Sequence, residues 1–443
     1  MQRVESDSLS LRKIFFFWVP LAATWLMMAT EGPFLAAVIA RLSDPKYNLA
    51  AYGVAYAVAV FIEAPIIMIM SASTALVKDR KSFYKLRNFT YFLNAVITLV
   101  MIILVIPPVF HFFAQKVITL PEDVAKLTHL ACLVLLPWPS AIGYRRFYQG
   151  ILIRSNLTRR VSYGTAVRLV SMASTAIICY VFFQLKGAVV GGLALSVGVM
   201  AEAVASKMMA RASVKRLIAK TYDGSGSDVV GYRYIASFYY PLALTSILGL
   251  SVPPLVTFFM GHSRMAIESL AVLPVINSLV FIFRSMGLSY QEVGIALLGE
   301  RNEHYKPLRN FALMLGVFAV SGLSLVAFTP LSILWFHKIS GLSAELTRFS
   351  LFPTRIMALY PGLMVLLSFQ RALMVNNRRT KSITKATAIE VLTIIILLLA
   401  AINLLDMVGA TAAAAALVLG RMMANTYLFF PYSRILKNIP RSD

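Results

Sequence analysis

The chain has 443 residues, of which 59% are hydrophobic and 14% are charged, and its formal net charge is +23. Soluble proteins carry about 25% charged residues, so this composition excludes an ordinary soluble globular protein and indicates a chain that lies in a bilayer.

Apolar runs recur along the whole chain, and each is long enough to cross the hydrocarbon core of a membrane as a helix. Membrane-spanning strands would give alternating segments of about ten residues, whereas these runs are continuous, so an all-α integral membrane protein is predicted. The first run is too long for a signal peptide and lacks a small-residue cleavage pattern, so it is expected to be retained. Twelve runs begin near Ile14, Leu49, Phe89, Leu127, Val161, Gly187, Tyr234, Ser269, Asn310, Leu346, Thr384 and Met407.

The basic residues lie mainly before the first run and in the loops that follow the even-numbered runs. The positive-inside rule then predicts a multi-pass protein with both termini in the cytoplasm. Topology accounts for most of the positive charge without nucleic acid, and an anionic substrate could account for the rest. Neither N-x-[ST] match, at Asn88 or at Asn156, lies in a predicted outer loop, which fits the inner or plasma membrane of a cell.

The two halves of the sequence resemble each other. Phe17 and Pro20 recur as Phe238 and Pro241, and Leu49 as Leu270, all at an offset of 221 residues, whereas Thr165 recurs as Thr387 at an offset of 222. Gln149 is matched with Gln370 at 221. Six helices per half make the repeat parallel, with an axis along the membrane normal, and substrate sites of such transporters lie between the halves. The predicted division is an N-lobe at 1–220, a cytoplasmic Gly/Ser linker at 221–232 and a C-lobe at 233–443; a duplicated scaffold without a cavity is the alternative.

Ionisable residues inside the predicted helices are the main functional signal. Twelve such groups facing lipid would cost about 30–40 kcal/mol, at about 2.5–3.5 kcal/mol each, whereas net stabilities are only about 5–15 kcal/mol. Most must therefore form pairs or line a hydrated cavity, with Arg146 and Arg371 expected to snorkel. The acids are Glu31, Glu63, Glu202, Glu292 and Glu390, and the bases are Arg145, Arg146, Arg168, Arg284, Arg355, Arg371 and Arg421.

Equivalent positions of the repeat carry opposite charges twice. Glu63 matches Arg284 at offset 221, and Arg168 matches Glu390 at offset 222. Symmetry puts equivalent residues at similar depths on opposite sides of the axis, so we expect ion pairs between the halves. These pairs act either as a gate that opens in one state or as static structural pairs.

Two of the acids stand beside helix breakers. Pro33 lies two residues after Glu31, and Pro65 lies two residues after Glu63. Proline removes a backbone hydrogen bond and kinks a helix. A carboxylate that alternates between a dry cleft and an arginine neighbour can carry a proton or bind a cation. The candidates for coupling to H⁺ or Na⁺ are Glu31, Glu63, Glu202 and Glu292; the alternative is a carboxyl group bonded to a neighbouring helix.

Motifs for other functions are missing from the sequence. It has no dinucleotide-binding, P-loop, zinc-protease or nucleophile-elbow motif, and its histidines are not spaced as a metal pair. Cys132 and Cys179 both fall in predicted helices, so no disulfide or metal framework is expected. The sequence therefore predicts neither an enzyme nor a resident metal or cofactor. Gly187-x-x-x-Gly191 predicts close helix packing.

Several short strings point to a family. These are Glu31 with its Ala-rich continuation, residues 51–56 AYGVAY, residues 353–361 PTRIMALYP with Arg355, and residues 408–411 VGAT. Together with the two six-helix blocks, they resemble the multidrug and toxic compound extrusion (MATE) transporters and their superfamily of oligosaccharide-lipid and lipid II flippases. Within it the chain is most similar to the progressive ankylosis family.

The resemblance implies twelve transmembrane helices in two pseudo-symmetric six-helix lobes, a central cleft and alternating access by a monomer. The progressive-ankylosis likeness implies export of small organic or phosphate-bearing anions such as citrate, pyrophosphate or ATP, with Arg168, Arg284 and Arg355 as candidate anion contacts. Classical drug exporters carry an Asp near Ala36, whereas this chain has Glu31 a turn earlier. A multidrug/cation antiporter and a lipid-linked oligosaccharide flippase remain alternatives. The substrate-binding or gating set is Glu31, Glu63, Arg168, Arg284, Arg355 and Glu390.

Overall fold

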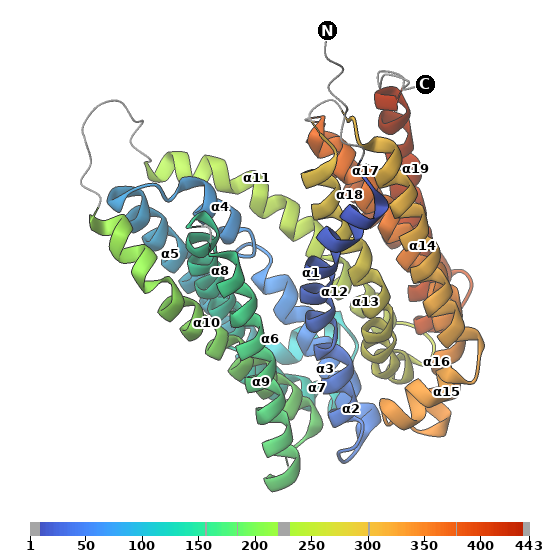
Figure 1. Cartoon of the computed structure of the whole chain (residues 1–443). Coiled ribbons are helices and arrows are strands. Elements are labelled where there is room, and N and C mark those ends of the chain that lie inside the picture. The colour runs from blue at the N-terminus through green and yellow to red at the C-terminus, as the bar shows by residue number, and fades with distance from the viewer. Residues whose placement is uncertain are drawn as a thin grey trace. The chain divides into compact units, whose positions relative to one another are not determined.

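The computed structural model describes residues 9–155, 157–183, 185–219, 231–299, 302–377 and 379–436, and this part of the chain is helical, as Figure 1 shows. Eleven helical stretches in it are long and apolar enough to cross a membrane. The twelfth predicted run, from Leu49, is also helical but is broken near Pro65. The expected all-α, multi-pass architecture is therefore confirmed.

The first half of the chain contains ten α-helices and one π-helical segment among the described residues. They are α1 (Leu11–Ala29), α2 (Glu31–Ile39), α3 (Pro45–Glu63), α4 (Ile69–Leu76), α5 (Arg80–Val105), α6 (Pro107–His111), η1 (Phe112–Val117), α7 (Glu122–Val134), α8 (Trp138–Arg154), α9 (Thr158–Phe182) and α10 (Gly187–Ala219).

The second half repeats this order. Its elements are α11 (Tyr232–Leu250), α12 (Val252–Gly261), α13 (Ala266–Leu297), α14 (Tyr305–Phe328), α15 (Leu331–Ile333), η2 (Leu334–Ile339), α16 (Ala344–Ile356), η3 (Met357–Leu359), α17 (Tyr360–Asn376), α18 (Thr380–Asn403) and α19 (Gly409–Leu436). The predicted linker at 221–232 lies outside the described residues up to residue 230, and α11 begins at Tyr232.

Irregular features recur at the repeat offsets. Thr30 separates α1 from α2, and Ser251, 221 residues later, separates α11 from α12. The rare π-helical segments η1 and η2 start 222 residues apart, at Phe112 and Leu334. Because chance does not place such features in register, the internal repeat is confirmed.

The helix bounds correct one sequence match. Helices α8 and α17 begin at Trp138 and Tyr360, so the offset in this segment is 222 rather than 221. Gln149 therefore corresponds to Arg371 and not to Gln370. A single matched Gln carries too little information to fix the register of an apolar helix.

Helix α3 ends beside its proline. The backbone tightens after Glu63, where the Ile66 N–H donates to the Glu63 carbonyl at 2.9 Å, and α4 begins at Ile69. Proline lacks an N–H and clashes with the preceding turn, which explains the break at Pro65. The second-half counterpart α13 runs through without a break, although it contains Pro274.

The described chain forms two compact units. Unit 1 consists of Met1–Pro33 and Val272–Asp443, and unit 2 is Phe34–Ala271. The compact units are thus not the sequence halves, because α1 lies with the second half and α11 lies with the first. The lobe division at 1–220 and 233–443 follows the sequence repeat and stays a prediction.

The two exchanged helices use equivalent side chains. In unit 1, Trp18 of α1 donates its indole N–H to Ser289 Oγ at 2.8 Å and packs against Phe311. In unit 2, Tyr239 of α11, at offset 221 from Trp18, donates its hydroxyl to the Pro65 carbonyl at 2.6 Å. That bond satisfies a backbone oxygen at the break after α3, where water would otherwise be needed.

Close packing of α10 follows from its glycines. A Cβ at Gly187 would lie 3.0 Å from the Ile39 side chain, and one at Gly191 would lie 2.7 Å from the Tyr52 ring. Both distances are shorter than normal carbon contacts, so the predicted close approach at this small-residue motif is confirmed. Large apolar side chains such as Phe182, Val170 and Val317 remain exposed, as is suited to a lipid environment.

Candidate functional site

A carboxylate surrounded by donors lies inside unit 2. Glu202 of α10 is fully buried and forms an ion pair with Arg145 of α8. Its other contacts come from Gln149, which donates to Oε1 at 3.0 Å, and from Arg168 of α9, whose Nε lies 3.6 Å from Oε2. Two guanidinium groups and an amide therefore hold Glu202 in its ionised form, and Arg145 and Arg168 face inward rather than lipid.

Glu63 lies in the same unit but has a different environment. Its side chain is 5% exposed, and its Oε2 has no hydrogen-bond partner in the described part of the chain. Its charged neighbours are Arg146, Arg145 and Arg168. Arg146 makes only a long contact, 3.9 Å, to the Met70 sulfur. Three arginines and two glutamates thus gather in unit 2, with one excess positive charge.

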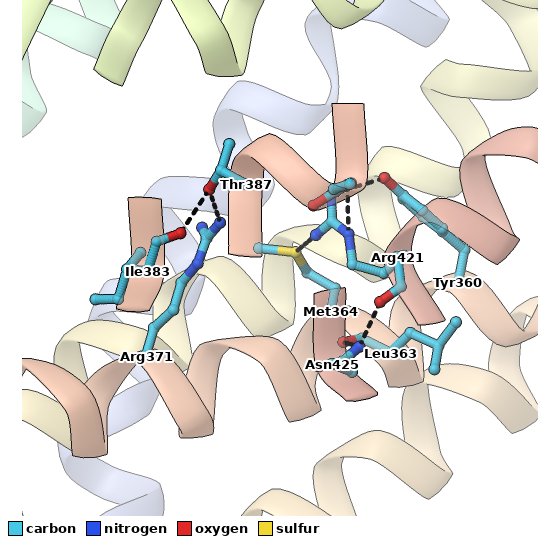
Figure 2. Close-up of polar contacts among 9 residues, drawn as sticks. Tyr360, Leu363, Met364, Arg371, Ile383, Thr387, Arg421 and Asn425 are labelled. Carbon is cyan, nitrogen blue, oxygen red and sulfur yellow. Dashed lines mark hydrogen bonds and ion pairs between the residues drawn. The ribbon is translucent and has the colours of Figure 1, made fainter. Parts of the chain in front are cut away.

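A second ion pair lies inside unit 1. Figure 2 shows Arg421 of α19 between Tyr360 and Met364, and its Nη2 lies 2.7 Å from Glu390 Oε1 of α18. The same Nη2 donates to the Tyr360 hydroxyl at 2.9 Å, and Nη1 contacts the Met364 sulfur at 2.7 Å. Donors and acceptors are matched here, so the pair is anchored on three sides.

Two further arginines lie close to this pair. Arg371 of α17 donates to Thr387 Oγ1 at 3.1 Å, as Figure 2 shows. The guanidinium of Arg284 on α13 lies 4.9 Å from the ring centre of Phe281 and 5.9 Å from that of Tyr360. No carboxylate pairs with Arg284 within the described part of unit 1, and its Nε has no hydrogen-bond partner there. Unit 1 therefore holds three arginines around Tyr360 and one paired acid, Glu390.

The expectation of snorkelling is wrong for two residues. Neither Arg146 nor Arg371 is exposed, and Arg371 donates inward to Thr387. Both stand near helix ends in the sequence, but their helices turn these positions toward neighbouring helices. Position along a helix gives the depth of a side chain, whereas the direction in which it points depends on packing.

The remaining sequence candidates are spread out. Glu31 is the first residue of α2, directly after the break at Thr30. Glu292 of α13 is partly buried and bonds to the Trp25 side chain. Arg355 is exposed, and its Nε donates to the Ala327 carbonyl at 3.3 Å. The structure thus brings Glu63 and Arg168 together in unit 2, and Arg284 and Glu390 together in unit 1, while Arg355 joins neither group.

Tyr360 is a site residue that the sequence interpretation missed. It contacts Arg421 through its hydroxyl and ring, and Arg284 through its ring. It begins α17 directly after the 3₁₀ turn η3. Nothing in the sequence separates it from the other 18 of the 19 tyrosines, because the feature that matters is its position between two arginines from different helices. Among the described residues, no cluster of three or more His, Cys, Asp or Glu side chains could hold a metal ion.

Comparison with known proteins places the fold. No protein-family model matches the chain, and no curated protein does. Among solved structures, the chain is similar to an inward-facing multidrug resistance MATE family transporter of the MOP superfamily, with a TM-score of 0.71 at 15% identity over 95% of this chain and 96% of that one. It is equally similar to the lipid II flippase MurJ in an inward closed conformation, with a TM-score of 0.71 at 14% identity over 95% and 90% of the two chains.

A third similar structure is a MOP superfamily transporter from Pyrococcus furiosus, described as having a binding pocket of reverse polarity that suggests a different function. Its TM-score is 0.65 at 14% identity over 97% of each chain. These likenesses confirm the expected MATE-like fold of the MOP transporters. The more specific resemblance to the progressive ankylosis family stays a prediction.

Proposed function

We propose that the protein is a secondary active membrane transporter that works by alternating access and moves small organic or phosphate-bearing anions. The fold supports the general part of this proposal, because similar structures in inward-facing and outward-facing conformations are MATE transporters. The parallel repeat supports it too, since transporters of this kind rearrange one repeat against the other. The substrate class rests on the arginines.

The observation that carries the anion proposal is the environment of Arg284. Its guanidinium lies over aromatic rings and has no carboxylate partner in the described part of its unit. An unpaired cation at membrane depth is costly, and such residues usually mark substrate or ion pathways. Guanidinium groups bind carboxylates and phosphates bidentately, so the ligand that would balance Arg284 is an anion.

The coupling ion is assigned to Glu63 rather than to Glu202. Two arginines and Gln149 hold Glu202, so releasing its charge would leave those donors without a partner. Glu63 has an unpartnered buried oxygen and stands at a helix break. Proton or cation uptake at Glu63 would therefore cost fewer existing contacts.

Transport by purified protein in proteoliposomes tests the proposal. Uptake of citrate, pyrophosphate, ATP and a cationic dye is measured in parallel for the wild type, Arg284→Gln and Arg355→Gln. Arg355 is the matched control, since it is exposed and lies outside both clusters. We expect anion transport that Arg284→Gln lowers at least about tenfold, the effect of about 1.4 kcal/mol of lost interaction. Dye transport without anion transport would overturn the anion proposal.

A lipid-linked oligosaccharide flippase is the second candidate. The likeness to the lipid II flippase at the same TM-score as to the MATE transporter favours keeping it. The proteoliposome assay separates the two if a fluorescent lipid-linked saccharide is added as a fifth substrate. Its transfer between leaflets, with no transport of soluble anions, would support the flippase and reject the anion exporter.

A further inference from the structure

A row of aromatic and basic side chains crosses three helices of unit 2 near their predicted cytoplasmic ends. The helices are α5, α8 and α10, which pack against one another and lie side by side in Figure 1. The row consists of Arg87 and Tyr91 on α5, Tyr144 on α8 and Lys207 on α10. None of these residues belongs to the clusters around Glu202 or Glu63.

Ring contacts connect the four residues in order. The Arg87 guanidinium lies 5.7 Å from the ring centre of Tyr91. The rings of Tyr91 and Tyr144 are nearly parallel, with an interplanar angle of 8° and centroids 6.0 Å apart. The Lys207 ammonium lies 5.7 Å from the ring centre of Tyr144. The tyrosine stack therefore holds two cations from different helices at one level.

Neither cation has an acidic partner. Arg87 bonds to the Asn88 amide oxygen at 3.3 Å and packs on Tyr84 at 4.8 Å, and its Nε has no hydrogen-bond partner in the described residues. Lys207 is exposed and interacts with Tyr144. Cation–π contacts only partly balance such charges, because a ring face carries no net charge. Two positive charges are therefore available for an anion outside the protein.

The surface that continues from the cations is apolar. On α5, exposed Leu99 lies 12 residues beyond Arg87, or about 18 Å along the helix. On α10, which runs in the opposite direction in the predicted topology, exposed Val204 and Met200 lie three and seven residues before Lys207. Half of a hydrocarbon core is about 15 Å thick, so these rows match the length of an acyl chain.

We propose that Arg87 and Lys207 bind the phosphate of an anionic phospholipid of the cytoplasmic leaflet, whose acyl chains lie along α5 and α10. The charge of the two cations complements a phosphodiester, and the apolar rows accept the chains. Basic pockets between transmembrane helices on the cytoplasmic side are known to recognise anionic head groups. Tyrosine at the membrane interface provides both ring stacking and a hydroxyl donor.

Native mass spectrometry of the full chain in detergent tests this site. The protein is titrated with phosphatidylglycerol and with phosphatidylcholine of the same acyl chains. We expect the wild type to prefer phosphatidylglycerol, and Arg87→Gln with Lys207→Gln to weaken that binding about 25-fold, from about fivefold per cation. The matched control, Lys215→Gln with Arg216→Gln, removes two exposed charges from α10 without touching the row and should keep the binding.

Further variants protect the test against misfolding. Arg87→Lys with Lys207→Arg keeps both charges and should retain the preference, and Lys207→Gln alone, at an exposed position, should lose about fivefold. Equal binding of the two lipids, a twofold or smaller loss in the double Gln variant, or an equal loss in the control would reject the site. Displacement of the lipid by inorganic phosphate at equal concentration would show that free phosphate is the ligand instead.

Discussion

Arg421 and Glu390 form an ion pair between the last two helices of unit 1, and its polarity is the reverse of the pair in unit 2. In unit 1 the acid is on α18 and the base on α19, at 2.7 Å. In unit 2 the base, Arg168, is on α9 and the acid, Glu202, is on α10, at 3.6 Å. Since α9 corresponds to α18 and α10 to α19, duplication kept the position of the pair but not its sign.

Breaking the pair of unit 1 from one side is expected to destabilise the protein strongly. Both side chains are at most 12% exposed, so Glu390→Gln would leave a buried guanidinium without a carboxylate. Such losses cost about 3–5 kcal/mol, whereas replacing both partners by apolar residues is often close to neutral. Unfolding in detergent should therefore show a large loss for Glu390→Gln and a much smaller one for Glu390→Leu with Arg421→Met. A double variant as unstable as the single one would contradict this.

The two buried acids of unit 2 are expected to respond differently to neutralisation. Glu202→Gln removes the carboxylate that Arg145 and Arg168 share, and it should lower the melting temperature clearly. Glu63→Gln removes a carboxylate with few bonds, so it should leave stability within about 1 kcal/mol but abolish coupling. Transport driven by an imposed proton or sodium gradient measures the second effect. If Glu63→Gln keeps gradient-driven transport, Glu63 does not carry the ion.

Charge exchange tests the hypothesis of ion pairs between the halves. Glu63 and Arg284 both lack an ion-pair partner within the described part of their own units. If they pair in one state of the transport cycle, Glu63→Arg alone should abolish transport and Glu63→Arg with Arg284→Glu should restore it. Arg168 and Glu390 already have partners in their units, so the same exchange there should not restore transport. Failure of the first exchange to rescue would reject direct pairing.

The N-terminus of α5 provides a pH-dependent contribution to stability. Burial alone would raise the pKa of the Asp79 carboxyl, but hydrogen bonds from the Ser82 backbone and hydroxyl lower it below its ordinary value. A pKa that is lower in the folded state stabilises the protein above the ordinary pKa of the group, and this contribution is lost as the pH falls through the folded-state value. Asp79→Ala should therefore cost about 1 kcal/mol at neutral pH.

The same variant supplies its own control. Below a pH of about 3, where the carboxyl of the wild type is protonated, the melting temperatures of the wild type and Asp79→Ala should converge. Asp79→Asn keeps a capping side chain and should lose less at neutral pH. A difference between wild type and Asp79→Ala that does not change with pH would show that the charge of the cap is unimportant.

The sequence by itself determined the features that lie within single helices. Run length and hydropathy gave the membrane spans, recurring residues gave the repeat, and Pro33 and Pro65 marked two breaks that the structure contains. These signals are local, because a helix records its own length, its apolar content and its interruptions in consecutive residues. The depth of each buried charge was also readable in this way.

Only the tertiary structure decided which charges meet. The sequence ranked Glu202 and Glu63 alike, but packing gives Glu202 three donors and leaves an oxygen of Glu63 unpartnered. It also brings Tyr360 against Arg421 and places α1 and α11 in units formed mainly by the other sequence half. Such pairings depend on the rotation of each helix about its axis and on which helices are neighbours. Both are set by the packing of many side chains at once, and no local pattern encodes them.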